Sequence, residues 1–306
     1  MFTKESVWMI LLKISSAHWN FHYFATLKQP FNKHKPMKNA LLFASAAVLV
    51  TFASCKKDPE PEPNPAVVAQ TQQATVFYFG GTWCGPCGAY GKPGKEYITK
   101  AYGDKAQIIS CQVNGGTADP MNCTSANALA GTFGVSSVPT MFIGGGGAIF
   151  NSIVGNGITN SSCATNVDQK LALTPEANMK FTTELSGNDI TVKAQTQFFK
   201  AITPTTGKYY IAAYLTEDGI SATQASDMST NKNIHDHVLR LTLGTSATGE
   251  LLGDAATQWE VKNFTFFGSL LNNWDKTKMH VNLVLWKQDP TTSKFTVSNS
   301  WIGKLQ

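Results

Sequence analysis

The sequence FYFGGTWCGPCGAYGKP (77–93) places two cysteines, Cys84 and Cys87, directly after an apolar run. The preceding ATVFYF (74–79) alternates β-branched and aromatic residues, which predicts a buried strand, and the GGTW that follows predicts a turn. From Cys84 onward the residues can form a helix. Pro86 falls in its first turn, where a missing N–H costs nothing. The stretch therefore predicts a strand, a turn and a helix with Cys84 at its N-terminus.

A cysteine in this position is suited to redox chemistry. The unpaired N–H groups and the helix dipole stabilise a thiolate at Cys84, which lowers its pKa and makes it a nucleophile. Cys87, one turn further along, would be shielded and able to attack a mixed disulfide formed at Cys84. We therefore expect the pair to exchange electrons with other dithiols, without a dissociable cofactor.

Two other roles for the cysteine pair compete with this interpretation. A zinc site would need a second close pair of Cys or His ligands. The other cysteines of the mature chain are isolated and its histidines lie far along the sequence, so we expect no metal. A purely structural disulfide between Cys84 and Cys87 would close a tight loop with little benefit to folding.

A second motif indicates a particular fold. WCGPC (83–87) after an apolar strand resembles the active site of thioredoxin-like proteins, and FGVSSVPTMFIGGGG (133–147) resembles the segment with the family's cis proline. Between them, AQIISCQVNG (106–115) predicts the next strand and TSANALAGTF predicts a helix. The resemblance covers residues 73–174 and implies an α/β thioredoxin-like domain, a mixed central sheet flanked by helices.

The resemblance also implies roles for individual residues. Cys84 would attack or accept a disulfide, and Cys87 would resolve it. Pro139 would be the cis proline that faces the pair, and the backbone of Val138 would pair with an extended substrate segment. The residues expected to shape the site and tune its potential are Trp83, Gly85 and Pro86.

Several positions depart from the thioredoxin pattern. Tyr78 stands where thioredoxin carries a buried carboxylate that accepts a proton. Gly88 and Gly91 each weaken the active-site helix by about 1 kcal/mol relative to alanine. The helix-bending proline comes one residue late, as Pro93, and NGGTADPMNC (114–123) lengthens the connection after the central strand. These departures leave a vestigial oxidoreductase open as an alternative.

Residues 1–54 form an N-terminal extension and a signal peptide. From Met37 a lysine, an apolar or small run (40–53) and then Cys55 follow in the order of a secretory signal. The run is shorter than the about 20 residues of a membrane span. FASC resembles the bacterial lipobox, so we expect lipidation of Cys55; a cleaved signal with an incidental cysteine is the alternative. We interpret residues 1–36 as an upstream extension before a start at Met37, or else as a genuine extra segment.

Charge is balanced beyond the signal peptide. The chain has 25 Lys and Arg and 20 Asp and Glu, but six of the lysines and one of the acids lie in residues 1–54. No basic face of the kind that binds nucleic acid is left, and we expect no such partner. The proline-rich and charged residues 55–72 predict a flexible tether between the lipid and the folded body. This arrangement predicts an outer-membrane location, on the periplasmic or the surface face.

Residues 175–306 have a different pattern. Runs such as DITVKAQTQFF, KYYIAAYLTED and KMHVNLVLWKQ alternate as strands do, with turn clusters between them. About seven short strands predict an all-β, immunoglobulin-like sandwich. YLTEDGI (214–220) and HDHVLR (235–240) resemble segments of the outer-membrane lipoprotein family related to Omp28, whose members place such a β domain after a thioredoxin-like one.

The remaining cysteines and histidines give weaker indications. Cys111 lies mid-strand, where burial as a small hydrophobe is expected. Cys123 and Cys163 could form a structural disulfide in an oxidising compartment. One cysteine is lipidated and two lie in the motif, so at least one of these three stays unpaired. His235 and His237 would point to one face of a strand, but without a third ligand we expect no metal there.

Two functions follow from these patterns. The first is a lipid-anchored envelope thiol–disulfide oxidoreductase that exchanges electrons with cysteine-containing envelope proteins and a redox partner protein. The second is a surface or outer-membrane binding or assembly lipoprotein. In that case the thioredoxin-like domain is a scaffold and the β domain makes the contacts.

Overall fold

The computed structural model describes residues 68–144 and 151–305 of the chain. They belong to one compact unit that extends from residue 61 to residue 306. The signal-peptide segment, Met37, Cys55 and most of the tether lie outside the described residues, and the predictions about them remain predictions.

The strand before the two cysteines lies at the centre of a mixed sheet, as predicted. β1 (Ala74–Gly80) pairs in parallel with β2 (Ala106–Gln112) and antiparallel with β3 (Thr140–Ile143). β3 pairs antiparallel with β4 (Asn151–Val154). Every residue of β1 is buried, because side chains pack against both faces of this sheet.

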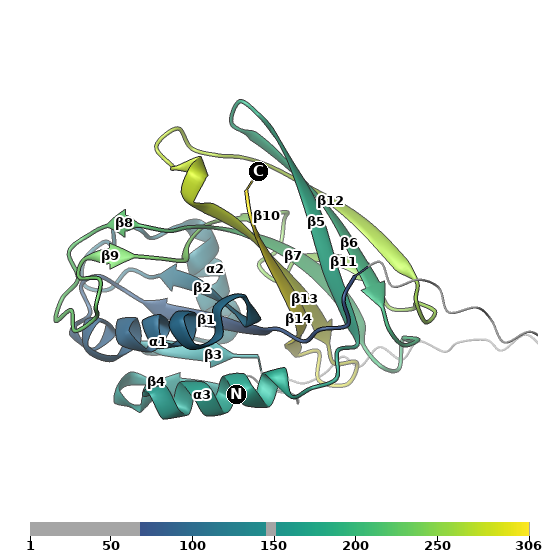
Figure 1. Ribbon diagram of the computed structural model, residues 1–306, viewed down its shortest axis with the longest axis horizontal. Coiled ribbons are helices and arrows are strands. Elements are labelled where there is room, and N and C mark those ends of the chain that lie inside the picture. Colours follow the sequence, from purple (N-terminus) through teal and green to yellow (C-terminus); the bar gives the residue numbers. More distant parts are fainter. Residues whose placement is uncertain (1–67, 145–150, 306) are drawn as a thin grey trace, which may run out of the picture. The chain divides into compact units, whose positions relative to one another are not determined.

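The helices lie on opposite faces of the sheet, because successive side chains of a strand point to opposite sides. The side chains of β1 at positions 74, 76 and 78 pack with α1 (Lys92–Tyr102) and α3 (Asn160–Leu171). Figure 1 shows these two helices on the same side of the sheet. Phe77 and Phe79 pack with α2 (Thr124–Phe133) on the other side. Short helical turns complete this part: η1 (Cys87–Gly91), η2 (Gly103–Lys105) and η3 (Gly155–Gly157).

The second half of the chain is a β-rich region of packed sheets, which confirms the predicted two-part fold. A sheet of order β12-β6-β5 packs against β7 and β13, and the apolar side chains between these layers form one core. A short hairpin of β8 and β9 extends from the region. The elements are β5 (Ala177–Ser186), β6 (Asp189–Phe198), β7 (Lys208–Glu217), β8 (Ile220–Ser221), β9 (Ile234–His235), β10 (Val238–Leu243), β11 (Glu250–Gly253), β12 (Val261–Ser269), η4 (Lys276–Lys278), β13 (Met279–Gln288) and β14 (Phe295–Lys304).

The β-rich region continues the sheet of the first half. β10 pairs antiparallel with β7 and, at Val238 and Ser110, in parallel with β2. The N–H of Ser110 donates to the carbonyl of His237 at 2.8 Å. The resulting sheet has the order β14-β13-β7-β10-β2-β1-β3-β4, with β11 pairing with β7. The predicted boundary at residue 174 thus falls between two sequence regions that share one sheet.

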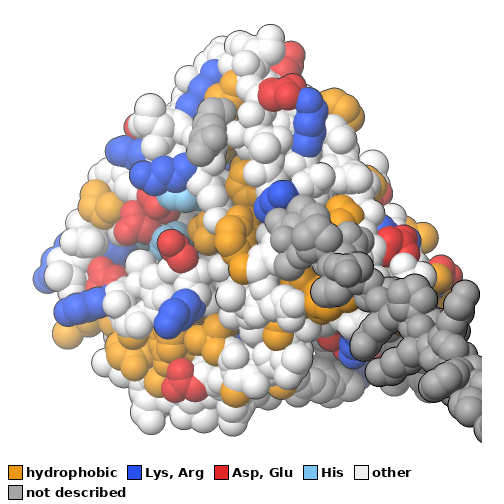
Figure 2. All heavy atoms as spheres, turned by 45° about the vertical axis from the view of Figure 1, so that its right-hand side comes forward, with side chains coloured by type: hydrophobic (Ala, Val, Ile, Leu, Met, Phe, Trp, Pro, Cys, Tyr) orange, Lys and Arg blue, Asp and Glu red, His pale blue; other side chains and the backbone are white. Residues whose placement is uncertain are grey.

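Charged side chains of both signs are interspersed on the face drawn in Figure 2. Apolar side chains lie between them in small groups. A continuous field of one sign is not seen on this face.

Candidate functional site

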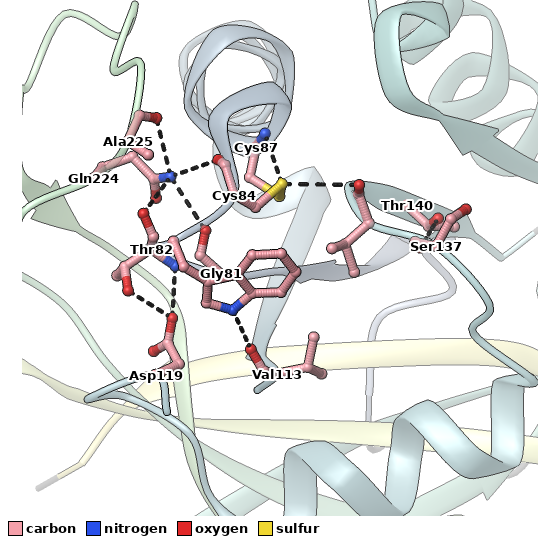
Figure 3. The surroundings of a disulfide bond; sticks show 12 residues. Gly81, Thr82, Cys84, Cys87, Val113, Asp119, Ser137, Thr140, Gln224 and Ala225 are labelled. Carbon is pink, nitrogen blue, oxygen red and sulfur yellow. Dashed lines mark hydrogen bonds between the residues drawn. A yellow bond between two sulfur atoms is a disulfide. The ribbon is translucent and has the colours of Figure 1, made fainter. Parts of the chain in front are cut away.

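Cys84 and Cys87 form a disulfide at the turn that follows β1 (Figure 3). The N–H of Cys84 donates to the carbonyl of Gly81 at 3.2 Å, and the N–H of Cys87 donates to that of Cys84 at 3.1 Å. Cys87 is completely buried, and Cys84 keeps an exposed fraction of 4%. Cys84 lines the adjoining groove and Cys87 does not, so Cys84 is the cysteine that a partner can reach.

The start of the helix is arranged to stabilise negative charge on Cys84. The N–H of Cys87 points at Cys84 Sγ, with an N···S distance of 3.1 Å. Gly85 and Pro86 begin the helix, and the π-helical turn η1 follows them. When the disulfide is reduced, the N–H of Cys87 and the helix dipole favour a thiolate at Cys84.

A groove borders Cys84 on the side of Pro139. The Val138–Pro139 peptide is cis, and the carbonyl oxygen of Val138 lies 3.8 Å from Cys84 Sγ. The groove has a volume of about 600 Å³, and its walls include Trp83, Gly85, Pro86 and Val138. The structure therefore brings the predicted site residues of the thioredoxin-like part together around the disulfide.

Trp83 forms an exposed edge of this groove. The indole ring is held in place because its N–H donates to the carbonyl of Val113 at 3.0 Å. A Cβ at Gly81 or Gly115 would overlap the indole, so these two glycines permit its position. With an exposed fraction of 38%, the ring offers an apolar surface beside Cys84.

Asp119, which the sequence reasoning missed, holds the turn from one side. Its buried carboxylate accepts hydrogen bonds from the N–H of Thr82 at 2.6 Å, the hydroxyl of Thr82 at 2.8 Å and the N–H of Met121 at 2.9 Å. Asp119 belongs to residues 114–123, which we predicted only as a lengthened connection. An acidic residue in the lengthened connection after β2, the strand that pairs in parallel with β1, was the available signal.

A loop of the β-rich region holds the turn from the other side. We call residues 222–233, which connect β8 and β9, the strap (Figure 1). The side-chain nitrogen of Gln224 lies 3.1 to 3.2 Å from three carbonyl oxygens of the turn, those of Gly81, Thr82 and Cys84 (Figure 3). The N–H of Ala225 also donates to the carbonyl of Thr82, at 2.8 Å. No local sequence pattern marks Gln224, since its partners lie far away along the chain.

The glycines of the active-site helix are explained by close packing. A Cβ at Gly88 would overlap the carbonyl oxygen of Ala225, and the carbonyl of Gly88 accepts the N–H of Met228 at 3.0 Å. A Cβ at Gly91 would overlap the hydroxyl group of Tyr78. Glycine at these positions lowers the helix propensity, but it allows the strap and Tyr78 to pack closely against the helix.

Comparison with known proteins identifies the family. The family model described as outer membrane protein Omp28 matches residues 126–304, more than half of the chain. The chain belongs to the Omp28 family. A second family model, thioredoxin, matches residues 62–169, so this Omp28-family protein also carries a thioredoxin domain.

Individual relatives of the Omp28-family protein agree with its thioredoxin domain. A thioredoxin of Chlorobaculum thiosulfatiphilum is 28% identical over 104 residues, which are 34% of this chain and 85% of the relative. A thioredoxin of Streptomyces clavuligerus is 30% identical over 104 residues, which are 34% of this chain and 86% of the relative. Among solved structures, HBP35 of Porphyromonas gingivalis matches with a TM-score of 0.57 at 15% identity. The match covers 78% of this chain and 76% of HBP35, so the likeness of fold extends over both parts.

This Omp28-family protein has a buried lysine, Lys95, in α1, the helix that follows the disulfide. Lys95 Nζ is 4.7 Å from the centre of the Tyr78 ring and donates to the hydroxyl of Ser110 at 2.9 Å. Burial lowers the pKa of Lys95 to about 8, and burial raises the pKa of Tyr78. A buried amine with a lowered pKa thus lies against Tyr78, at the position where the resemblance implied a carboxylate.

The suggested Cys123–Cys163 disulfide is absent, and both residues are free thiols. Cys123 is the N-cap of α2, and its Sγ lies 3.3 Å from the carbonyl of Leu239. Cys163 is buried in α3. Because α2 and α3 cover opposite faces of the sheet, the two thiols cannot meet. Burial raises the pKa of both, and also that of the free thiol of Cys111, which disfavours the thiolate at all three.

The prediction that His235 and His237 share a strand is wrong. His235 ends β9, and burial lowers its pKa to about 4. His237 precedes β10 and has a left-handed backbone, with φ of 60°. Within residues 68–144 and 151–305, no group of three or more His, Cys, Asp or Glu side chains could hold a metal ion. In the same part of the chain, the helices are too short or too polar to cross a membrane.

Proposed function

We propose that this Omp28-family protein is an envelope thiol–disulfide oxidoreductase that exchanges electrons with cysteine-containing proteins. The observation that carries the proposal is the Cys84–Cys87 disulfide at the start of a helix, with Cys84 on the wall of an open groove. The thioredoxin domain and its relatives support redox chemistry at this pair. The proposal extends this chemistry to partners in the envelope.

The reaction follows from the unequal exposure of the two sulfurs. In the reducing direction, the thiolate of Cys84 attacks one sulfur of a partner's disulfide. The Cys84–partner bond forms, the partner's S–S bond breaks, and the leaving thiolate takes a proton from solvent. Cys87, after losing its proton, attacks Cys84 Sγ. The Cys84–Cys87 bond then forms again and the partner's second thiolate leaves.

Two electrons pass to the partner in this sequence. A redox partner protein then reduces the Cys84–Cys87 disulfide to the dithiol by the same steps in reverse. If the protein instead oxidises its partners, the partner's dithiol reduces the Cys84–Cys87 disulfide by these reverse steps. The groove beside Val138 and Trp83 is the place where an extended cysteine-containing segment would lie.

The membrane location rests on the sequence at Cys55 and on the family. The Omp28 match supports association with the envelope, and the proposed lipid at Cys55 would supply the anchor. The expected result is a palmitate label on the wild-type protein that disappears with Cys55→Ala. A soluble, unlabelled wild-type protein would contradict the anchor.

The decisive experiment for the redox function is a trap in intact cells. Replacing the resolving residue, Cys87→Ser, should leave partners bound to Cys84 as mixed disulfides that a reductant releases. Cys84→Ser is the matched control and should trap nothing, and Cys163→Ser should behave like wild type because that thiol is buried away from the groove. An empty trap with a folded Cys87→Ser protein would reject the proposal.

A second candidate is a binding or assembly lipoprotein with a structural thioredoxin domain. It is favoured by the position of the Omp28 match, most of which lies in the β-rich region. A variant with both Cys84→Ser and Cys87→Ser decides between the two. Full function of this variant in cells supports the binding role, and its loss supports the redox role. Deleting residues 175–306 would be uninformative, because it removes the strand that pairs with β2.

A further inference from the structure

Gln224 brings a side chain of the β-rich region to the redox turn. Its exposed fraction is 8%, and its Nε2 lies 3.1 Å from the carbonyl oxygens of Gly81 and Cys84 and 3.2 Å from that of Thr82 (Figure 3). A side-chain amide has two N–H donors, so the carbonyl groups share them. The turn that carries Cys84 is thus supplied with donors from a distant part of the chain.

The strap that carries Gln224 is anchored to the active-site helix by a buried cation. Lys92 Nζ lies 2.8 Å from a carboxylate oxygen of Asp227, and both side chains are nearly inaccessible. The same ammonium donates to the hydroxyl of Ser229 at 2.9 Å and to the carbonyl of Asn231 at 2.6 Å. These contacts saturate the three N–H groups of the lysine. The strap is therefore a built part of the site.

A cluster of carbonyl oxygens beside a thiolate is unfavourable, because each presents the negative end of its dipole. The carbonyl of Cys84 already accepts from the N–H groups of Cys87 and Gly88, and Gln224 adds a further donor there. On the opposite side, the carboxylate of Asp119 receives the N–H of Thr82. The donors of Gln224 thus offset the negative ends of the carbonyl dipoles on the strap side of Cys84.

We propose that Gln224 is a positioning residue that stabilises the reduced, thiolate form of Cys84 and so makes the Cys84–Cys87 pair more oxidising. This inference rests on the proposed electron exchange for its biological use. Its sign follows from the couple itself: an interaction that favours the dithiol over the disulfide raises the reduction potential. Removing the donors should therefore favour the disulfide and shift the ionisation of Cys84 to higher pH.

The test compares full-length wild type with Gln224→Ala and Gln224→Glu. The readouts are the equilibrium with a glutathione buffer and the thiolate absorbance of the reduced protein against pH. We expect Gln224→Ala to shift the equilibrium about tenfold toward the disulfide, which is about 30 mV. Gln224→Glu, nearly the same shape, should shift it further in the same direction at neutral pH, because a carboxylate donates nothing and also adds a negative charge beside the carbonyl oxygens. The matched control is Gln258→Ala, which removes a side chain that donates to the carbonyl of Phe199 on a remote turn and should change neither readout.

A merely structural role for Gln224 would lower stability without moving the thiolate titration. Unchanged potential and ionisation in a folded Gln224→Ala protein would overturn the proposal. If Gln224→Ala does not fold, the same measurements on Gln224→Glu test the proposal. A thiolate titration of Gln224→Glu that matches wild type would overturn the proposal. The two proposals fail separately. If the Gln224 variants have a shifted potential and a shifted Cys84 ionisation but the Cys87→Ser trap is empty, the partner exchange is rejected and the role of Gln224 stands.

Discussion

The two faces of the sheet around β1 are completed in different ways. On the face of α1 and α3, the core consists of side chains from the thioredoxin part itself. On the face of α2, Phe77 packs with Tyr214 and Trp286 of the β-rich region, with ring centres 5.8 and 5.4 Å apart. The apolar core of the first face is complete within the thioredoxin part, and that of the second face is not. We infer that the two sequence regions fold together.

The largest effect should come from Trp286→Ala. Trp286 is fully buried, and its indole N–H donates to the hydroxyl of Tyr214 at 3.0 Å. Its removal leaves a cavity on the shared face and should lower the free energy of unfolding by about 3–5 kcal/mol. The measurement is denaturant unfolding followed by circular dichroism and by the reactivity of Cys163, which lies on the other face. Two separate transitions would contradict the comparison.

Lys92→Met should have the next largest effect. It leaves Asp227 buried without its cation, which costs about 3 kcal/mol when one partner of a buried pair is removed. The matched control is Lys193→Met, whose pair with Glu184 is exposed on both sides and should contribute less than about 1 kcal/mol. Denaturant unfolding compares the two variants. Equal effects would show that the strap does not stabilise the site.

Gly88→Ala tests the close approach of the strap. The added methyl group would overlap the carbonyl of Ala225, so we expect a loss of about 1–3 kcal/mol from overpacking. In α2, a Cβ at Gly131 would meet open space, and Gly131→Ala should instead stabilise by up to about 1 kcal/mol. In thermal unfolding, Gly88→Ala should lower the melting temperature and Gly131→Ala should raise it, which would distinguish the two helices. Stabilisation by both would mean that the strap moves aside freely.

The smallest effect near neutral pH concerns Lys95 on the face of α1 and α3. Its pKa of about 8 is below the about 10.4 of an unfolded lysine. Between these values the unfolded chain binds more protons, so raising the pH should increase stability. This gain should be smaller in Lys95→Met when unfolding is measured from pH 7 to pH 10; the remainder comes from Lys170, whose pKa burial also lowers to about 8. The same slope in both proteins would assign it to another group.

The sequence predicted what is encoded locally. Cys84, Cys87 and the cis peptide at Pro139 belong to short motifs, and β1 is marked by its own apolar pattern. The pairing of Val238 with Ser110 and the reach of Gln224 to the turn join residues far apart along the chain, and no local pattern specifies them. Gly88 carried a signal that we interpreted only as lost helix propensity. A glycine where alanine would be better is also the mark of a backbone approached closely.

The shared sheet also limits how this redox motif can be transplanted. A chimera cut at residue 174 would leave the edge of β2 without β10 and would expose the rings of Phe77 and Phe79, which are completely buried in the native chain. An unpaired strand edge beside exposed aromatic rings promotes aggregation. Grafting the CGPC segment into a new host therefore requires carrying over the later strands and the strap, although they share no motif with it.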